Sequence, residues 1–285
     1  MIAFAYPAFF HVFCPVDSRN NAIGVFDSGI GGLTVLKAIH ESLPNEDLIY
    51  FGDTAHMPYG DKSADLIAYY SEGITRFLLQ NHCKMIVIAC NTASAYGYKK
   101  ALEAAGTDIP VVNVVDPSVD LIINDFAKAK IGVIGTKGTI NSGIYKRKLN
   151  KSSPLLEVVS QATPLLAPMI EEGFFNNKIS RTIINAYLSK KSFEKIDAIL
   201  LACTHYPLIK KEIEEFYKGH TRVIDSAETV AQAVRSVLSQ KELRAQREAS
   251  GSIKAYVSDL TPAFEKSTEI FFNRKISLEK KNIWS

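Results

Sequence analysis

The sequence predicts an α/β protein made of two similar α/β domains, each built on a largely parallel sheet and related by pseudo-twofold symmetry. Two observations predict this. Short apolar runs alternate with amphipathic helical patterns along most of the chain, and several motifs recur at offsets of 108 to 113 residues. Continuously apolar strands that alternate with helices are typical of parallel sheets covered on both faces. We therefore expect a functional site in the cleft between the domains, beyond the carboxyl ends of the strands.

The individual elements follow from the apolar pattern. Strands are expected at residues 23–26, 48–51, 85–89, 111–115, 131–134, 156–159, 198–202, 222–224 and 253–257. Apolar residues at helical spacing predict intervening helices, most clearly over residues 64–80. A further helix is expected over residues 93–105, ending at Gly106, because glycine commonly follows the last helical residue.

Three pairs of motifs indicate that one α/β unit is duplicated. IGVFDSG resembles IGVIGTKG, VVDPS resembles VIDSAE, and IVIACNTAS resembles ILLACTHYP. The offsets are 108 from Ile23 to Ile131, 109 from Asp116 to Asp225 and 113 from Cys90 to Cys203. The predicted domains are residues 21–116 with 226–285, and residues 117–225, preceded by an N-terminal extension over residues 1–20.

Composition excludes several classes of protein. The formal net charge is +3, from 33 basic and 30 acidic residues, which is too small a surplus to suggest nucleic-acid binding. No segment approaches the ~18 consecutive apolar residues of a membrane-spanning helix. The apolar N-terminus has no preceding Lys or Arg and contains Pro7 and Pro15, so it fits a secretory signal poorly.

Two of the four cysteines stand out. Cys14 lies in the extension and Cys83 precedes a strand, and no disulfide is expected for a chain without a secretory signal. Cys90 and Cys203 each follow a strand and precede polar residues and a helical pattern. A helix N-terminus can lower the pKa of a thiol below its usual value of ~8.5. Such a thiol can act as a nucleophile, a metal ligand, a redox centre or an acid/base group.

The presence of two such cysteines at corresponding positions favours some of these four roles over others. A structural zinc site normally needs about four ligands at short spacing, and redox chemistry favours a nearby resolving cysteine. A Cys–His hydrolase using Cys203, His205 and Asp27 stays open. A racemase needs acid/base groups on opposite faces of a stereocentre, which matching positions on duplicated domains would supply. Two inert cysteines that merely end buried strands are the plain alternative.

Polar residues flank both cysteines. Asn91, Thr92 and Ser94 follow the first, and Thr204 and His205 follow the second. The loop DSGIGG is similar in character but does not match G-x-G-x-x-G, because Thr34 occupies the last position. No Lys or Arg lies within these motifs, so we expect hydroxyls, Asn91 and helix N-termini to bind an anionic ligand.

At these residues the chain resembles the glutamate racemases of the aspartate/glutamate racemase family. The matching segments are GVFDSGIGGLTVL, YFGDTAHMPYG, IVIACNTASA, IGVIGTKGTINS, LLAPMIEEG and LLACTHYPLI, which cover roughly residues 22–272. The resemblance implies interconversion of L- and D-glutamate without pyridoxal phosphate, another cofactor or a metal. It also implies a cytoplasmic homodimer with no membrane or nucleic-acid partner, which supplies D-glutamate for peptidoglycan.

The resemblance also implies roles for particular residues. Cys90 and Cys203 would be the catalytic pair, assisted by Asp27 and His205. The substrate would be held by Asp27, Ser28, Tyr59, Gly60, Asn91, Thr92, Thr204 and His205. Asp27 could equally meet the substrate ammonium or cap the next helix. Either Glu171 or Glu172 of the IEEG segment would face the site, or both would face solvent.

One position departs from the family, and two other functions stay open. His56 stands where the family usually has arginine, which we interpret as surface variation that can alter the packing of the tyrosine loop (residues 57–60, MPYG). The first alternative function is a non-catalytic amino-acid-binding protein, although binding alone does not need two thiols. The second is racemisation of aspartate or hydantoin on the same fold, against which the THYP segment favours glutamate.

Overall fold

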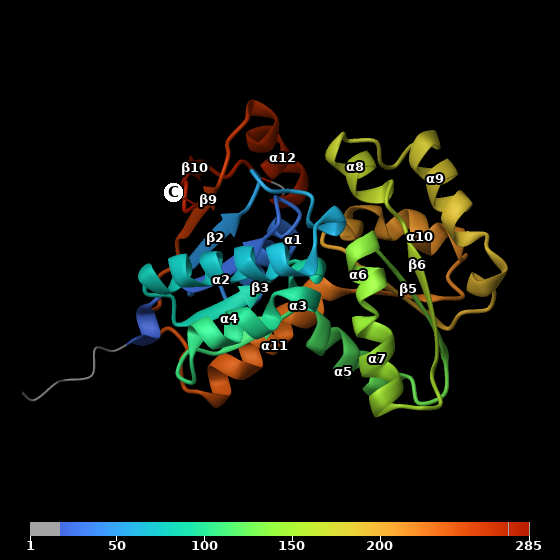
Figure 1. The fold of residues 1–285 in the computed structure, drawn as a ribbon, viewed down its shortest axis with the longest axis horizontal. Coiled ribbons are helices and arrows are strands. Elements are labelled where there is room, and N and C mark those ends of the chain that lie inside the picture. The colour runs from blue at the N-terminus through green and yellow to red at the C-terminus, as the bar shows by residue number, and fades with distance from the viewer. Residues whose placement is uncertain (1–17, 273, 285) are drawn as a thin grey trace, which may run out of the picture.

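Two parallel sheets frame the molecule in the computed structural model, which describes residues 18–272 and 274–284 (Figure 1). Cys14 and most of the expected N-terminal extension lie outside the described residues. Within them the first sheet has the order β10-β9-β2-β1-β3-β4 and the second β6-β5-β7-β8. The strands are β1 (Ile23–Asp27), β2 (Leu48–Gly52), β3 (Met85–Ile88), β4 (Val111–Asn113), β5 (Lys130–Gly135), β6 (Glu157–Ala162), β7 (Ala198–Ala202), β8 (Arg222–Asp225), β9 (Ile253–Val257) and β10 (Leu278–Lys280).

Four strands of the first sheet have the same order as the four strands of the second. β1 lies between β2 and β3, with β4 beyond β3, and β5 lies between β6 and β7, with β8 beyond β7. Every pairing is parallel. Cys90 and Cys203 therefore come just after corresponding strands, β3 and β7, and the predicted fold class is confirmed. The predicted domain limits stay a prediction, which the membership of β9 and β10 in the first sheet supports.

Helices cover both faces of the sheets (Figure 1). They are α1 (Leu33–Ser42), α2 (Ala64–Gln80), α3 (Asn91–Tyr96), α4 (Tyr98–Ala105), α5 (Val115–Asp125), α6 (Lys137–Ser142), α7 (Ile144–Ser152), α8 (Leu166–Glu171), α9 (Lys178–Leu188), α10 (Lys210–Phe216), α11 (Ser226–Gln240) and α12 (Pro262–Phe272), with 3₁₀ turns η1 (Ser18–Asn20), η2 (Tyr59–Asp61), η3 (Lys191–Phe193) and η4 (Tyr206–Ile209). No helix in the described ranges is long and apolar enough to cross a membrane.

Two expected elements differ clearly from the structure, and one strand was not expected. The strand expected at 111–115 ends at Asn113, because the Asn113 side chain accepts hydrogen bonds from the N–H groups of Val115 and Asp116 and starts α5. The helix expected at 93–105 is two helices, α3 and α4, which meet at Gly97. The short strand β10 was not expected, since two of its three residues are exposed and give no apolar run.

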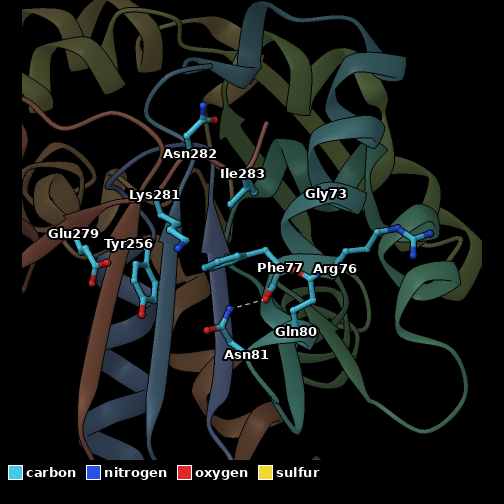
Figure 2. Close-up of a pocket in the computed structure, with 10 residues that line it drawn as sticks. All are labelled: Gly73, Arg76, Phe77, Gln80, Asn81, Tyr256, Glu279, Lys281, Asn282 and Ile283. Atoms are coloured by element: carbon cyan, nitrogen blue, oxygen red, sulfur yellow. Dashed lines mark hydrogen bonds between the residues drawn. The ribbon is translucent and has the colours of Figure 1, made fainter. Parts of the chain in front are cut away.

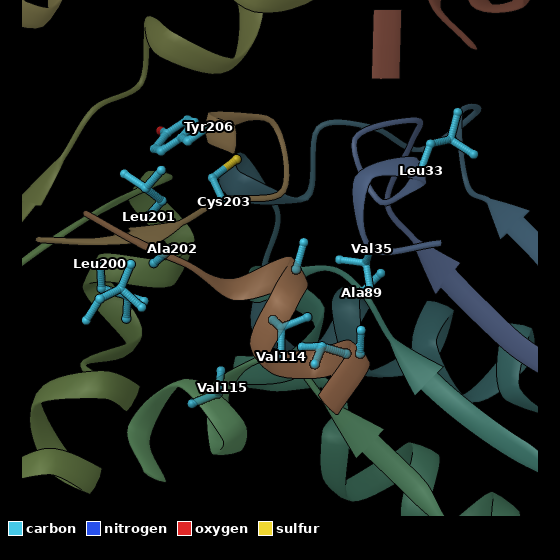
Figure 3. Close-up of a cluster of buried hydrophobic side chains, with 14 of the residues drawn as sticks. Leu33, Val35, Ala89, Val114, Val115, Leu200, Leu201, Ala202, Cys203 and Tyr206 are labelled. Atoms are coloured by element: carbon cyan, nitrogen blue, oxygen red, sulfur yellow. The ribbon is translucent and has the colours of Figure 1, made fainter. Parts of the chain in front are cut away.

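A continuous apolar cluster joins the two halves of the molecule. It includes Val35 and Ala89 from the first half and Leu201, Ala202 and Cys203 from the second. Figure 3 shows Leu201, Ala202 and Cys203 on one side of Val114, and Val35 and Ala89 on the other. The two halves therefore share a core, and the residues at their strand ends are held in fixed relative positions.

The residues after β10 cross the edge of α2. Lys281 N donates to Val257 O, and Ile283 and Trp284 pack against a second, smaller apolar cluster that contains Phe77. Figure 2 shows Asn282 and Ile283 above Phe77, beside an open groove of about 540 Å³. None of the residues lining this groove is a cysteine or histidine.

Candidate active site

A cavity of about 230 Å³ lies beyond the carboxyl ends of strands from both sheets. Most of the expected site residues line it: Ser28, Tyr59, Gly60, Cys90, Asn91, Thr92, Glu171, Cys203, Thr204 and His205. Asp27 and Glu172 do not line it. Gly29, Met57, Pro58, Thr136, Ala167, Pro168 and Ala202 line it and were not expected. None of these lining residues is Lys or Arg, so hydroxyl, amide and backbone groups provide most of its polar atoms.

Cys90 caps the start of α3. Its Sγ accepts a hydrogen bond from Ala93 N at 3.4 Å and lies 3.5 Å from Ser28 Oγ. Burial, and next the negative charge of Asp27, raise the pKa of the Cys90 thiol to about 12. The helix N-terminus does lower this pKa, through Ala93 N, and contacts with Ser28 lower it further, but desolvation and the Asp27 charge outweigh them. Cys90 is a neutral thiol at physiological pH and can donate a proton.

Cys203 belongs to a chain of three interacting side chains. His205 Nδ1 lies 3.6 Å from Cys203 Sγ, and His205 Nε2 lies 2.8 Å from Glu171 Oε1. Burial opposes a charge on His205, but the contacts with Cys203 and Glu171 outweigh it, so the pKa of the imidazole lies well above its usual value. A protonated His205 stabilises negative charge on Cys203 Sγ. Glu172 is exposed, so Glu171 is the glutamate that faces the cavity.

Asp27 organises the loop after β1. Its Oδ2 accepts hydrogen bonds from Gly29 N at 3.1 Å and Gly32 N at 3.0 Å. Its buried Oδ1 has no hydrogen-bond partner among the described residues. Asp27 therefore fixes the DSGIGG loop and places a negative charge near Cys90, behind the cavity wall.

Asn91 presents an unpaired donor. Its Oδ1 accepts a hydrogen bond from Tyr145 OH at 2.6 Å, which orients the amide. The buried Nδ2 has no hydrogen-bond partner in the described part of the chain. A buried N–H group without a partner is costly, so this position fits an acceptor such as a carboxylate oxygen.

Comparison with known proteins agrees with this geometry. The model of the Asp/Glu/Hydantoin racemase family matches residues 23–234. The chain belongs to the Asp/Glu/Hydantoin racemase family. The chain is 42% identical over 257 residues to a glutamate racemase of Geobacter metallireducens, covering 90% of this chain and 94% of that one. It is 41% identical to one of Chlorobaculum parvum, covering 91% and 95% respectively.

Solved structures of racemases share the fold. The glutamate racemase of Francisella tularensis, solved in complex with D-glutamate, has a TM-score of 0.87 and 37% identity, covering 93% of this chain and 99% of that one. The glutamate racemase of Thermus thermophilus, in complex with beta-chloro-D-alanine, has a TM-score of 0.83 and 35% identity, covering 92% and 97%. This member of the racemase family therefore keeps the two-sheet architecture over nearly its whole length.

The tyrosine loop of this racemase-family chain is tied to a buried acid. Tyr59 OH donates to Asp53 Oδ2 at 2.7 Å, and burial, then the Asp53 charge, raise the pKa of Tyr59 far above its usual value. His56 was interpreted as surface variation that can alter the packing of the tyrosine loop, and the surface part of that interpretation is wrong. His56 is half-buried, stacks on Tyr70 at 4.3 Å between ring centroids, and places Nδ1 2.9 Å from Asp53 Oδ1.

Thr136 was missed by the sequence analysis. Its Oγ1 lies 2.9 Å from Thr92 Oγ1 and 3.0 Å from Thr139 Oγ1, so three hydroxyls meet where the halves face each other. The sequence duplication would have identified Thr136, because it corresponds to Ser28 in the first half of the chain. Thr136 follows β5 at an offset of 108 from Ser28, which follows β1, and this is the offset between Ile23 and Ile131.

Proposed function

We propose that this chain interconverts L- and D-glutamate, with Cys90 and Cys203 exchanging protons at the substrate Cα. One observation carries the proposal. Two thiols, each about 6% exposed, line a single cavity from corresponding strand ends of two units with the same strand order. Such an arrangement gives each face of a planar carbanion its own acid/base group.

The surroundings of the thiols support distinct starting roles. In one direction, Cys203 Sγ, beside His205, takes the proton from Cα, and the electron pair stays on the carbanion. Cys90, a neutral thiol with a pKa of about 12, then donates its proton to the opposite face. The reverse direction exchanges these roles. In each direction one cysteine, as a thiolate, accepts a proton from Cα and the other, as a thiol, donates one to it, so the proposed reaction needs no cofactor.

Polar groups of the cavity suit the substrate. Asn91 Nδ2 is an unpaired buried donor, and the hydroxyls of Ser28, Thr92, Thr136 and Thr204 lie along the same cavity. Neutral donors bind a carboxylate without a strongly basic clamp that would stabilise the resting substrate as much as the transition state. D-Glutamate is the ligand in the Francisella tularensis relative, which supports glutamate as the substrate here.

The activity is tested by proton NMR of L-glutamate in deuterated buffer, with no added cofactor, together with a chiral assay. We expect loss of the α-proton signal and appearance of D-glutamate. Aspartate and hydantoin assayed in parallel separate the related racemase activities. If the folded protein exchanges none of these α-protons, the amino-acid-binding alternative replaces this proposal.

The two-thiol mechanism is tested by Cys90→Ser and Cys203→Ser. Each is expected to lower kcat by about 10²-fold or more, the usual contribution of a positioned acid/base group. Cys83→Ala is the matched control, since Cys83 is buried outside the cavity and should leave turnover near normal. Near-normal turnover in either serine variant would refute the two-thiol mechanism.

A cytoplasmic location, a homodimeric assembly and a supply of D-glutamate to peptidoglycan accompany this proposal. The support for them is the resemblance to the racemase family. The assembly is checked by light scattering of the purified chain across a concentration series. A mass of one chain at all concentrations would rule out the dimer.

A further inference from the structure

The C-terminal tail (residues 281–284) reaches a cluster of aromatic rings beside the tyrosine loop. The ring centroid of Trp284 lies 5.1 Å from that of Tyr70, 5.3 Å from that of His56 and 5.9 Å from that of Tyr69. Ile283, the preceding residue, packs above Phe77 (Figure 2). The tail therefore holds the single tryptophan of the chain against α2 and the segment that follows β2.

Trp284 packs against Gly73, where the absence of a side chain leaves space for the indole ring. Gly73 lies inside α2, where a glycine costs about 0.5–1 kcal/mol relative to alanine. A Cβ placed on Gly73 would lie 2.6 Å from Cζ3 of Trp284. The helix therefore contains a glycine at the one turn on which the indole ring rests, which gives this unfavourable residue a packing role.

The indole is connected to the cavity through Asp53. Trp284 Nε1 donates to Asp53 Oδ1 at 3.2 Å, and Ser258 Oγ donates to the same oxygen at 2.8 Å. Asp53 Oδ2 accepts the hydroxyl of Tyr59 at 2.7 Å. Asp53 is fully buried, and Tyr59 lines the cavity. The Asp53 carboxylate therefore accepts hydrogen bonds from the tail, from the residue that follows β9 and from the tyrosine loop.

We propose that Trp284 is a positioning residue for substrate binding, which acts through Asp53 to hold the tyrosine loop (residues 57–60) against the cavity. The inference rests on the proposed function for its substrate, glutamate. The tyrosine loop forms part of the cavity wall but contains neither of the two cysteines. Loss of Trp284 therefore weakens binding of both enantiomers and leaves proton transfer by the two cysteines largely intact.

The kinetic test compares Trp284→Ala, Trp284→Phe and Gly73→Ala with Lys281→Ala, an exposed tail residue, as the control. Trp284→Ala is expected to raise KM for L- and D-glutamate by about 3- to 10-fold with kcat within about twofold of wild type. Trp284→Phe keeps a ring but loses the N–H donor, so its KM should be intermediate. Lys281→Ala should match wild type.

A double variant distinguishes loss of the specific contact between Gly73 and Trp284 from a general loss of packing around the tail. Gly73→Ala should raise KM as Trp284→Ala does, because its methyl group displaces the indole. The double variant Gly73→Ala/Trp284→Ala should show no further increase, since the two changes remove the same contact. Additive effects on KM would contradict the proposal.

A second readout needs no activity. The pKa of Cys83 and that of Cys90 are each raised to about 12, so their alkylation by iodoacetamide depends chiefly on exposure. In Trp284→Ala, peptide mass spectrometry should show faster alkylation of Cys90, in the cavity wall, with Cys83 unchanged. Equal acceleration at both, or none at Cys90, would overturn the proposal. This comparison decides it even if wild type fails to racemise glutamate.

Discussion

Cys90 and Cys203 occupy matching positions in surroundings of opposite charge. Asp27 places negative charge behind Cys90 and helps to raise its pKa to about 12. His205, whose pKa lies well above its usual value, stands 3.6 Å from Cys203 Sγ. The duplicated scaffold thus carries an asymmetric pair, with an acidic neighbour beside Cys90 and an imidazole of raised pKa beside Cys203.

Glu171, together with Cys203, raises the pKa of His205, and Glu171→Gln tests the contribution of Glu171. The carboxylate 2.8 Å from His205 Nε2 favours the charged imidazolium, and a neutral amide does not. His205 should therefore lose its proton at lower pH in the variant. The alkaline limb of kcat/KM should move to lower pH, measured as a pH–rate profile and as a histidine NMR titration.

The neighbouring residue provides the control for this shift. Glu172→Gln removes the same charge one position away, on an exposed side chain outside the cavity. Its pH profile should superimpose on that of wild type. An identical shift in both variants would mean that long-range charge, and not the Glu171 contact, controls His205.

Much of the site could be predicted from residue patterns next to the strand ends. Asn91, Thr92, Thr204 and His205 were expected because polar residues directly follow apolar strands. The choice between Glu171 and Glu172 could not be made. The helix α8 has only six residues and ends at Glu171, so its apolar pattern is too short to fix which side faces inward.

Gly97 divides one expected helix into α3 and α4. A Cβ on Gly97 would lie 2.0 Å from Oγ and 2.4 Å from Cβ of Ser71 on α2. The backbone of Gly97 has φ −97° and ψ −13°, which alanine also adopts, so the contact with α2 is what requires glycine. The sequence shows the glycine but not the helix that passes over it.

Gly97→Ala should lower the free energy of unfolding by about 1–3 kcal/mol, the usual cost of overpacking. Urea denaturation followed by circular dichroism measures it. Lys99→Ala on α4 is the control, because the Lys99 side chain is 89% exposed and alanine suits a helix. Equal stability of Gly97→Ala and wild type would show that α2 moves away without loss of packing.

The strands were predictable because continuous apolar runs are visible in sequence. The helix that spans residues 64–80 was predicted with both of its ends, since its apolar residues keep one face over 17 residues. The start of α5 depends on hydrogen bonds that Asn113 Oδ1 accepts from backbone N–H groups, and β10 depends on pairing with β9. Both arise from contacts that no local hydrophobic pattern records.

Duplication predicted the architecture of the whole molecule, but not how closely the halves approach. Thr136 meets Thr92, and Thr34 Oγ1 donates to Thr204 O across the chain. These contacts join residues far apart in sequence. They place polar loops of the two halves around one cavity, and the relative position of the thiols depends on them.

Gly31 marks the tightest of these approaches, and substituting it tests how rigidly the halves must be placed. A Cβ on Gly31 would lie 2.4 Å from Nδ1 and Cε1 of His205 and 2.7 Å from Thr204 Oγ1. His205 cannot retreat without losing its contacts with Cys203 and Glu171. Gly31→Ala should lower kcat/KM by about 10²-fold, as expected for a displacement of about 1 Å.

A second glycine in the same loop provides the comparison for Gly31→Ala. A Cβ on Gly29 meets Met57 Sδ at 3.2 Å, and a flexible methionine side chain can shift to accept it. Gly29→Ala should therefore cost much less in kcat/KM. Steady-state racemisation rates and urea unfolding are measured for both variants, so that lost turnover is separated from lost stability. If both alanines reduce kcat/KM equally while both proteins stay folded, then backbone freedom of the loop, and not contact between the halves, limits catalysis.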